Sequence, residues 1–264
     1  MADDDTPFNE ENVVLSDSFL TQLLNNHGVH TQTYNDINLY RKALLHKSYC
    51  TKKNENFKSG NLECPQGCLP LQEESNERLE FLGDAILNLV VADYLYERYP
   101  DANEGFLTKI RTRLVNGTML AHLAEKIQLG KHIIISKQIE SNNGRHNKKI
   151  LEDAFEAILG AMYIDFNSFK INTSSQTKST IDNCGIGFQI TSAFIVHVLE
   201  KYVDFSDLVR QKENPKDKLM KQCQHTFQWT PKLLEMDITE VDNMRVHNIC
   251  VRNKNNDIIA VGKG

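Results

Sequence analysis

The sequence of 264 residues contains no apolar run close to the roughly 20 residues that span a bilayer. It opens with Met1-Ala2-Asp3-Asp4-Asp5, which is acidic where a secretion signal is basic. Its cysteines are few and scattered, unlike the dense cysteines of small secreted scaffolds: Cys50, Cys64, Cys68, Cys184, Cys223 and Cys250. We therefore expect an intracellular protein of the cytoplasm or nucleus, with free thiols and no membrane partner.

An excess of positive charge is also missing, since the formal net charge is −5. This shortage argues at first against a nucleic-acid partner, but the charge is unevenly distributed. After residue 209 there are ten Lys/Arg against seven Asp/Glu, whereas the first 209 residues hold 20 against 28. An acidic catalytic part followed by a mildly basic tail is compatible with a metal-rich site joined to a polyanion-binding module.

The composition, 40% hydrophobic and 25% charged, is typical of a globular chain with one large or two ordinary domains. We predict a disordered N-terminus over 1–15, a helical domain over 16–203 and a linker over 204–213. Ser16 or Asp17, and Asn35 or Asp36, are expected to cap the first two helices. Residues 51–73 and 167–187 interrupt the periodicity and are expected to be long loops.

The most informative stretch is Asn76 to Leu87, in which Glu77, Glu80 and Asp84 are spaced i, i+3 and i+7. At 3.6 residues per turn these carboxylates share one face of a helix. The intervening residues are mostly apolar, and a buried carboxylate costs several kcal/mol unless a cation compensates it. A divalent metal is the natural counter-charge, and a solvated acidic stripe is the alternative.

A second apolar helix, from about Lys148 to Ile164, carries Asp153 and Glu156 at i and i+3. Four acids converging from two helices form an oxygen cage that suits a hard ion such as Mg²⁺. Between these helices, Lys109, Arg111 and Arg113 form a basic face that is either solvated or in contact with phosphate. From Pro215 onward one helix and three strands are expected, over 214–264.

The series of motifs resembles the ribonuclease III family of double-stranded-RNA endonucleases. The similarity covers Leu45-His46-Lys47-Ser48-Tyr49, Asn76 to Leu87, Asn103-Glu104-Gly105-Phe106-Leu107 and Leu151 to Ala161, in order over roughly 35–202. The tail from about 214 resembles a double-stranded-RNA-binding domain. The resemblance implies an all-α catalytic domain of the ribonuclease III fold, followed by a small α+β domain with α-β-β-β order, incomplete because the family continues into a second helix.

The resemblance also implies a homodimeric, Mg²⁺-dependent hydrolase in which Mn²⁺ substitutes, cleaving double-stranded RNA to 5′-phosphate and 3′-hydroxyl ends with short 3′ overhangs. By motif position, Glu80, Asp84, Asp153 and Glu156 are the metal ligands and catalytic residues. Glu77 and Glu104 match two auxiliary acidic positions. The chemistry is consistent with this assignment, because two metal ions activate water and stabilise the leaving oxygen without a protein nucleophile.

Some positions depart from the simple bacterial pattern. Lys149 resembles a lysine that eukaryotic relatives place near the scissile phosphate, and its two interpretations are a catalytic role and a solvated first-turn lysine. In the tail, Arg245 and Met220-Lys221 replace usual residues, and we expect RNA contacts from Lys216, Lys221, Arg245 and Lys263. Without the second helix we expect a weakened or unfolded tail. The alternative function is a catalytically silent RNA-binding or scaffolding relative, which usually lacks one or more of the four ligands.

Overall fold

The computed structural model describes residues 6–30, 33–51, 63–167, 185–210, 215–241 and 244–263. The chain forms two compact units, Met1–Val209 and Arg210–Gly264. In the described part, no helix has the length and apolar character needed to cross a membrane. Much of the two expected loops, 52–62 and 168–184, lies outside the described residues.

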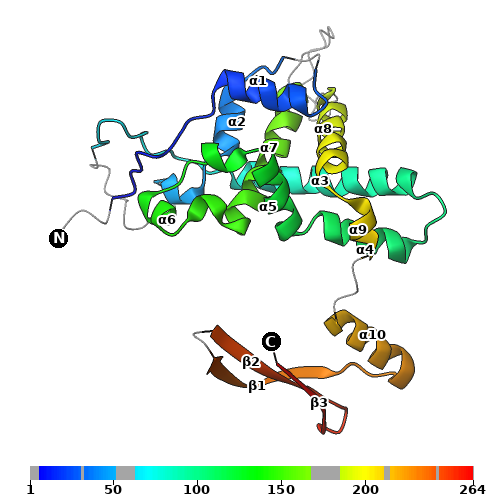
Figure 1. Ribbon diagram of the computed structural model, residues 1–264. Coiled ribbons are helices and arrows are strands. Elements are labelled where there is room, and N and C mark those ends of the chain that lie inside the picture. The colour runs from blue at the N-terminus through cyan, green and yellow to red at the C-terminus, as the bar shows by residue number, and fades with distance from the viewer. Residues whose placement is uncertain are drawn as a thin grey trace, which may run out of the picture. The chain divides into compact units, whose positions relative to one another are not determined.

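The first unit is helical and the second has one helix and a sheet, as the sequence predicts (Figure 1). The helices of the first unit are α1 (Asp17–Asn26), α2 (Ile37–Ala43), α3 (Glu77–Arg98), α4 (Glu104–Leu114), α5 (Gly117–Lys126), α6 (Lys137–Ser141), α7 (Lys148–Asn167), α8 (Gly187–Tyr202) and α9 (Phe205–Arg210). Short 3₁₀ turns occur at Lys47–Tyr49, Leu129–His132 and Gly144–His146. Helix α9 occupies part of the segment that the sequence suggested as a linker.

Side-chain caps begin several of these helices, and two were expected. Ser16 accepts a hydrogen bond from the Phe19 amide, and Asp36 accepts one from the Asn38 amide. Such a cap satisfies an amide that has no partner inside the helix. Asn103 caps α4 in the same way by accepting from Phe106, and this places Glu104 in the first turn.

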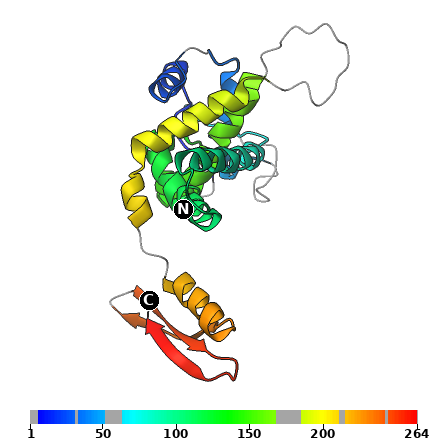
Figure 2. The same cartoon turned by 90° about the vertical axis from the view of Figure 1, so that its right-hand side faces the viewer.

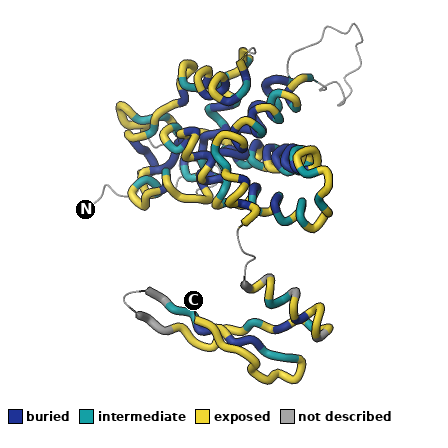
Figure 3. Tube along the Cα trace, turned by 45° about the vertical axis from the view of Figure 1, so that its right-hand side comes forward, coloured by how far each residue is buried: buried dark blue, intermediate teal, exposed yellow. Residues whose placement is uncertain are grey.

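Helix α7 is the central element of the first unit and packs against α2, α3, α5 and α8 (Figures 1 and 2). Most of its length is buried, including Ala154, Phe155, Ile158 and Ala161. Helix α3 is buried along one side only, so buried and exposed residues alternate along it (Figure 3). The apolar cores of these two helices hold the backbones that carry the acidic residues.

The N-terminal segment 6–15 is not disordered as expected, because it packs on the helical unit. Phe8 and Leu15 are buried. The Asn9 and Asn12 side chains each donate a hydrogen bond to the Ile135 carbonyl, at 3.2 and 3.0 Å. The polar composition that suggested disorder supplies these backbone contacts instead.

Asp165 of α7 is a fully buried acid that anchors the start of α2. Its carboxylate accepts hydrogen bonds from the Asn35 amide at 3.0 Å and the Asp36 amide at 2.8 Å. It also accepts one from the Tyr40 hydroxyl at 3.1 Å. Burial and this carboxylate raise the pKa of Tyr40. Asp165 is therefore a structural carboxylate, distinct from the cluster described below.

The second unit contains α10 (Pro215–Phe227) and the strands β1 (Lys232–Val241), β2 (Met244–Arg252) and β3 (Ile258–Lys263). The sheet is antiparallel in the order β1-β2-β3, with Leu234 and Val261 both paired to Cys250. Cys250 is buried, whereas Leu234 and Val261 are exposed. The structure shows the tail folded into one helix and a three-stranded sheet, where the sequence led us to expect a weakened or unfolded tail.

Candidate metal centre

Helix α3 presents its three acids along one side, as the spacing predicts. Glu77 and Glu80 are half-buried and Asp84 is exposed. The Asp84 carboxylate accepts a hydrogen bond from the Asn88 side chain one turn later, at 2.8 Å. Glu77 accepts one from the Ser75 hydroxyl at 3.0 Å.

Two glycines allow α3 and α7 to approach closely at the level of these acids. A Cβ on Gly83 would lie 1.7 Å from the Glu156 carbonyl oxygen, and a Cβ on Gly160 would lie 2.3 Å from the Leu79 carbonyl oxygen. Both distances are far below van der Waals contact, so only glycine fits at either position. The backbones are therefore close enough for side chains from the two helices to meet.

Three of the four predicted ligands meet where these helices touch. Glu80, Asp153 and Glu156 each offer a carboxylate oxygen, and the three oxygens lie within 4.8 Å of one another. Asp84 lies beside them, since it lines the same hollow of about 460 Å³ as Glu80 and Glu156. The structure thus brings three acids into one cluster and places the fourth on its wall.

The electrostatics of the cluster reflect burial and crowding of like charges. Burial, followed by the charges of Asp84, Glu152 and Glu80, raises the pKa of Glu156 to about 8, although Lys149 opposes the shift. Burial and Asp153 likewise raise the pKa of Glu80. Without a further cation, the cluster therefore favours keeping a proton on Glu156 at neutral pH.

The donor set fits a hard divalent ion. Carboxylate oxygens are the ligands that Mg²⁺ and Mn²⁺ prefer, and a dication relieves the repulsion that raises the pKa of Glu156. Within the part of the chain that the structure describes, this is the only group of three or more His, Cys, Asp or Glu side chains with metal-ligand proximity.

Lys149 lies at the edge of the cluster and is not simply solvated. Its Nζ atom is 2.8 Å from Asp153 Oδ1 and 3.4 Å from Glu152 Oε2, while the side chain remains 64% exposed. The hydrogen bond to Asp153 is the main cause that raises the pKa of Lys149. Lys149 thus forms ion pairs with two carboxylates beside the cluster.

Glu152 lies beside the cluster but was not among the site residues predicted from the sequence. It lines the hollow with Glu80, Asp84 and Glu156. A Cβ on Gly117, the first residue of α5, would lie 2.6 Å from Glu152 Oε2, so this glycine leaves room for the carboxylate. The available signal was its position four residues before Glu156, which places both on one helix face.

The auxiliary acids are placed differently from each other. Glu77 lines the hollow and lies 3.8 Å from the Lys47 ammonium. Glu104 is exposed on α4, accepts a hydrogen bond from the Thr108 hydroxyl at 2.8 Å, and is not among the residues lining the hollow. The structure therefore brings only Glu77 to the cluster.

The residues expected to contact RNA belong to the second unit. Lys216 on α10 and Lys263 at the end of β3 are exposed. Lys221 belongs to α10 and Arg245 to β2, and their side chains lie outside the described residues. The role of all four in RNA binding stays a prediction.

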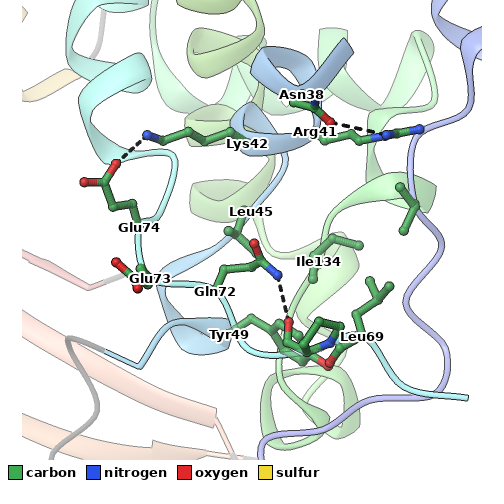
Figure 4. A pocket seen from close by; sticks show the side chains of 12 residues that line it. Asn38, Arg41, Lys42, Leu45, Tyr49, Leu69, Gln72, Glu73, Glu74 and Ile134 are labelled. Atoms are coloured by element: carbon green, nitrogen blue, oxygen red, sulfur yellow. Dashed lines mark hydrogen bonds and ion pairs between the residues drawn. The ribbon is translucent and has the colours of Figure 1, made fainter. Parts of the chain in front are cut away.

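A larger cavity of about 540 Å³ lies beside α2 and has a different chemistry (Figure 4). Its lining is mixed, with apolar Leu45, Leu69 and Ile134 together with an ion pair between Lys42 and Glu74 at 2.5 Å. A paired, mixed lining offers no concentration of carboxylates. The smaller hollow is therefore the candidate metal centre.

Comparison with known proteins agrees with this geometry. The family model described as Ribonuclease-III-like matches residues 36–178. The ribonuclease 3 of Aliarcobacter butzleri is 48% identical over 128 residues, covering 48% of each chain, and that of Nitratiruptor is 41% identical over 143 residues, covering 54% of each. The chain spans about half the length of these curated relatives.

The nuclease domain of ribonuclease III from Campylobacter jejuni has a similar structure, with a TM-score of 0.50 and 31% identity over 70% of this chain and 97% of that one. That domain is described as flexible in a region involved in dimer formation. The matched segment contains both acidic helices and accounts for more than half of the 264 residues. The chain therefore belongs to the ribonuclease III family.

Proposed function

We propose that this protein is a metal-dependent endoribonuclease that hydrolyses double-stranded RNA. The observation that carries the proposal is the cluster of Glu80, Asp153 and Glu156 on two glycine-packed helices, inside the segment that matches the family model. Curated relatives of this segment are named ribonuclease 3. All four expected ligands are present, which favours an active enzyme over a silent relative.

In this proposal the acids bind metal and Lys149 contacts the substrate. Glu80, Asp153 and Glu156, with Asp84 on the wall, would hold Mg²⁺ or Mn²⁺. Two divalent ions at such a site supply Lewis acidity, which lowers the pKa of water and stabilises the leaving 3′ oxygen. The carboxylates of α3 and α7 would hold the ions, and hydrolysis of the phosphodiester by water would leave a 5′-phosphate and a 3′-hydroxyl. Lys149, whose side chain is 64% exposed, would contact the scissile phosphate.

The exposed side of α3 supports a homodimer. Phe81, Leu89 and Tyr96 are 80%, 58% and 68% exposed. Their spacing puts them on one helix face. An apolar face of this kind marks an interaction site, and a second copy of the chain is the partner that the relative from Campylobacter suggests. Phe81 also lines the acidic hollow, so a dimer through this face would bring its interface beside the metal centre.

Dimerisation is testable through this face. Leu89→Asp should convert a dimer into a monomer in sedimentation-velocity experiments, because a charge would then be buried in the interface. Val13→Asp, at an apolar position of the same unit that is 53% exposed, is the matched control. If both variants dimerise as strongly as the wild-type chain, the interface does not lie on this face of α3.

We assign duplex binding to the second unit as well as the first. Lys216, Lys221, Arg245 and Lys263 would contact phosphates and 2′-hydroxyls, which is how double-stranded RNA is recognised by shape. Two copies of the catalytic unit, each cutting one strand, would leave short 3′ overhangs. We propose that the enzyme acts inside the cell.

The decisive experiment is digestion of a long, end-labelled RNA duplex with and without Mg²⁺, beside single-stranded RNA and duplex DNA. We expect Mg²⁺-dependent cleavage of the RNA duplex alone, with 5′-phosphates and short 3′ overhangs on the products. Glu156→Gln serves as the inactive control. Binding without cleavage by the wild-type chain, in Mg²⁺ and in Mn²⁺, would favour the silent relative instead.

A further inference from the structure

The acidic cluster already has a cation of its own. Lys149 Nζ lies 2.8 Å from Asp153 Oδ1, on the carboxylate that also belongs to the group of Glu80, Asp153 and Glu156. A carboxylate oxygen engaged by an ammonium group at this distance is less available to a metal ion. Lys149 and the metal therefore compete for Asp153.

A second carboxylate is positioned to receive the lysine. Glu152 Oε2 lies 3.4 Å from the same Nζ, and its side chain is only 20% exposed. Gly117 provides the space for this carboxylate, and the start of α5, where backbone amides lack helical partners, favours a negative charge there. Glu152 is not one of the three acids whose carboxylate oxygens converge, which are Glu80, Asp153 and Glu156.

We propose that Lys149 is a resident counter-cation of the metal-free site, and that metal binding transfers it from Asp153 to Glu152. This inference rests on the proposed metal site and adds a role for two residues around it. Lys149 neutralises the cluster when no metal is bound. Glu152 then holds the displaced ammonium at the rim, where it faces the substrate phosphate.

The exchange predicts opposite effects for the two side chains on metal affinity. Lys149→Met removes the competitor, so Mg²⁺ should bind about three- to fivefold more tightly, the range of a partly exposed ion pair. Glu152→Gln removes the alternative partner, so Lys149 stays on Asp153 and Mg²⁺ should bind more weakly. Because Glu152 acts through Lys149, its effect should shrink in the double variant.

The test is titration of the full chain with MgCl₂. Calorimetry measures the Mg²⁺ affinity, and the rise in unfolding temperature with MgCl₂ gives a second readout. Lys148→Met is the matched control. Lys148 is exposed and lies one position earlier, and its replacement removes the same charge. Glu156→Gln marks the loss of site binding. Circular dichroism of each metal-free variant verifies the fold.

The outcomes separate the exchange from the metal site itself. Tighter binding in Lys149→Met alone, with the Glu152→Gln effect lost in the double variant, supports the exchange. The exchange is overturned, with the metal site left in place, if Lys148→Met and Lys149→Met gain the same Mg²⁺ affinity. It is also overturned if Glu152→Gln changes the Mg²⁺ affinity equally in the wild-type and Lys149→Met proteins. Absence of Mg²⁺ binding in every protein overturns both the exchange and the proposed function.

Discussion

Replacing Gly83 by alanine tests whether the close approach of α3 and α7 builds the site. The added Cβ would lie 1.7 Å from the Glu156 carbonyl oxygen, 2.6 Å from its carbonyl carbon and 3.0 Å from the Gly160 nitrogen. All three atoms are backbone and cannot rotate away. The two helices must move apart, and this movement should also separate Glu80 from Asp153 and Glu156.

Two opposing effects decide the magnitude. Alanine is favoured over glycine inside a helix by about 1 kcal/mol, which alone predicts a more stable protein. Overpacking a core costs about 1–3 kcal/mol, and contact with rigid backbone puts this site at about 3. The net loss of about 2 kcal/mol should lower the unfolding temperature by about 4–8 °C for a unit of this size.

The measurement is thermal unfolding with and without MgCl₂, beside Gly105→Ala as the control. Gly105 lies in the first turn of α4, and a Cβ there would meet its nearest neighbour, Asn103 Oδ1, at an ordinary 3.5 Å. The control should be as stable as wild type or slightly more stable. Gly83→Ala should be less stable, and MgCl₂ should no longer raise its unfolding temperature. A Gly83→Ala protein that is as stable as wild type and still responds to Mg²⁺ would refute the reasoning.

Four further predictions concern the acids. Glu156→Gln should abolish cleavage while RNA binding persists, as measured by gel shift beside the digestion assay; residual Mg²⁺-dependent cleavage would contradict the ligand assignment. Because the pKa of Glu156 is raised to about 8, Mg²⁺ must displace a proton from Glu156 when it binds below that pH. The affinity for Mg²⁺ should therefore rise up to about tenfold per pH unit below pH 8 and level off above it. Calorimetry that finds no pH dependence of the Mg²⁺ affinity would argue against this. The same pKa shift means that, between about pH 4.5 and 8, the native metal-free protein keeps a proton on Glu156 that the unfolded state loses. The free energy of unfolding should therefore fall as the pH rises from about 4.5 to 8, and it should fall less in Glu156→Gln. Asp165→Ala leaves two backbone amides and the Tyr40 hydroxyl without their acceptor, so it should cost about 3 kcal/mol or more in urea unfolding. Asp207→Ala, at an exposed position of α9, should cost almost nothing.

The sequence predicted those features that depend on local spacing. The i, i+3 and i+7 acids lie on one side of α3, and Ser16 and Asp36 cap the helices that follow them. Caps and helix faces are set by residues within about one turn, so a single sequence contains the information. The convergence of two acidic helices followed from the cost of burying unpaired carboxylates.

Features that depend on tertiary contact were missed. No local pattern in the sequence indicates that Glu152 will lie against Gly117 of α5, because that contact forms only in the folded chain. Asp165 carries no local sign that the start of α2 will lie on its carboxylate. The segment 6–15 was assigned to disorder from its polar composition, but Asn9 and Asn12 donate to a carbonyl more than 120 residues away. Long-range pairing of polar side chains leaves no periodic signal.

Core packing and the acidic cluster depend on the same two backbones. Buried side chains such as Leu87 and Val90 on α3 or Ile158 on α7 each contribute about 1.5–3 kcal/mol, which holds the helices together against the repulsion of their acids. The acids therefore cannot move apart without loss of the core. Repulsion must be relieved by a positive charge, and three candidates compete for this role: the Lys149 ammonium, a proton on Glu156 and a divalent ion. Since each occupies the cluster at the expense of the others, pH and Lys149 should both set how tightly the site holds its metal.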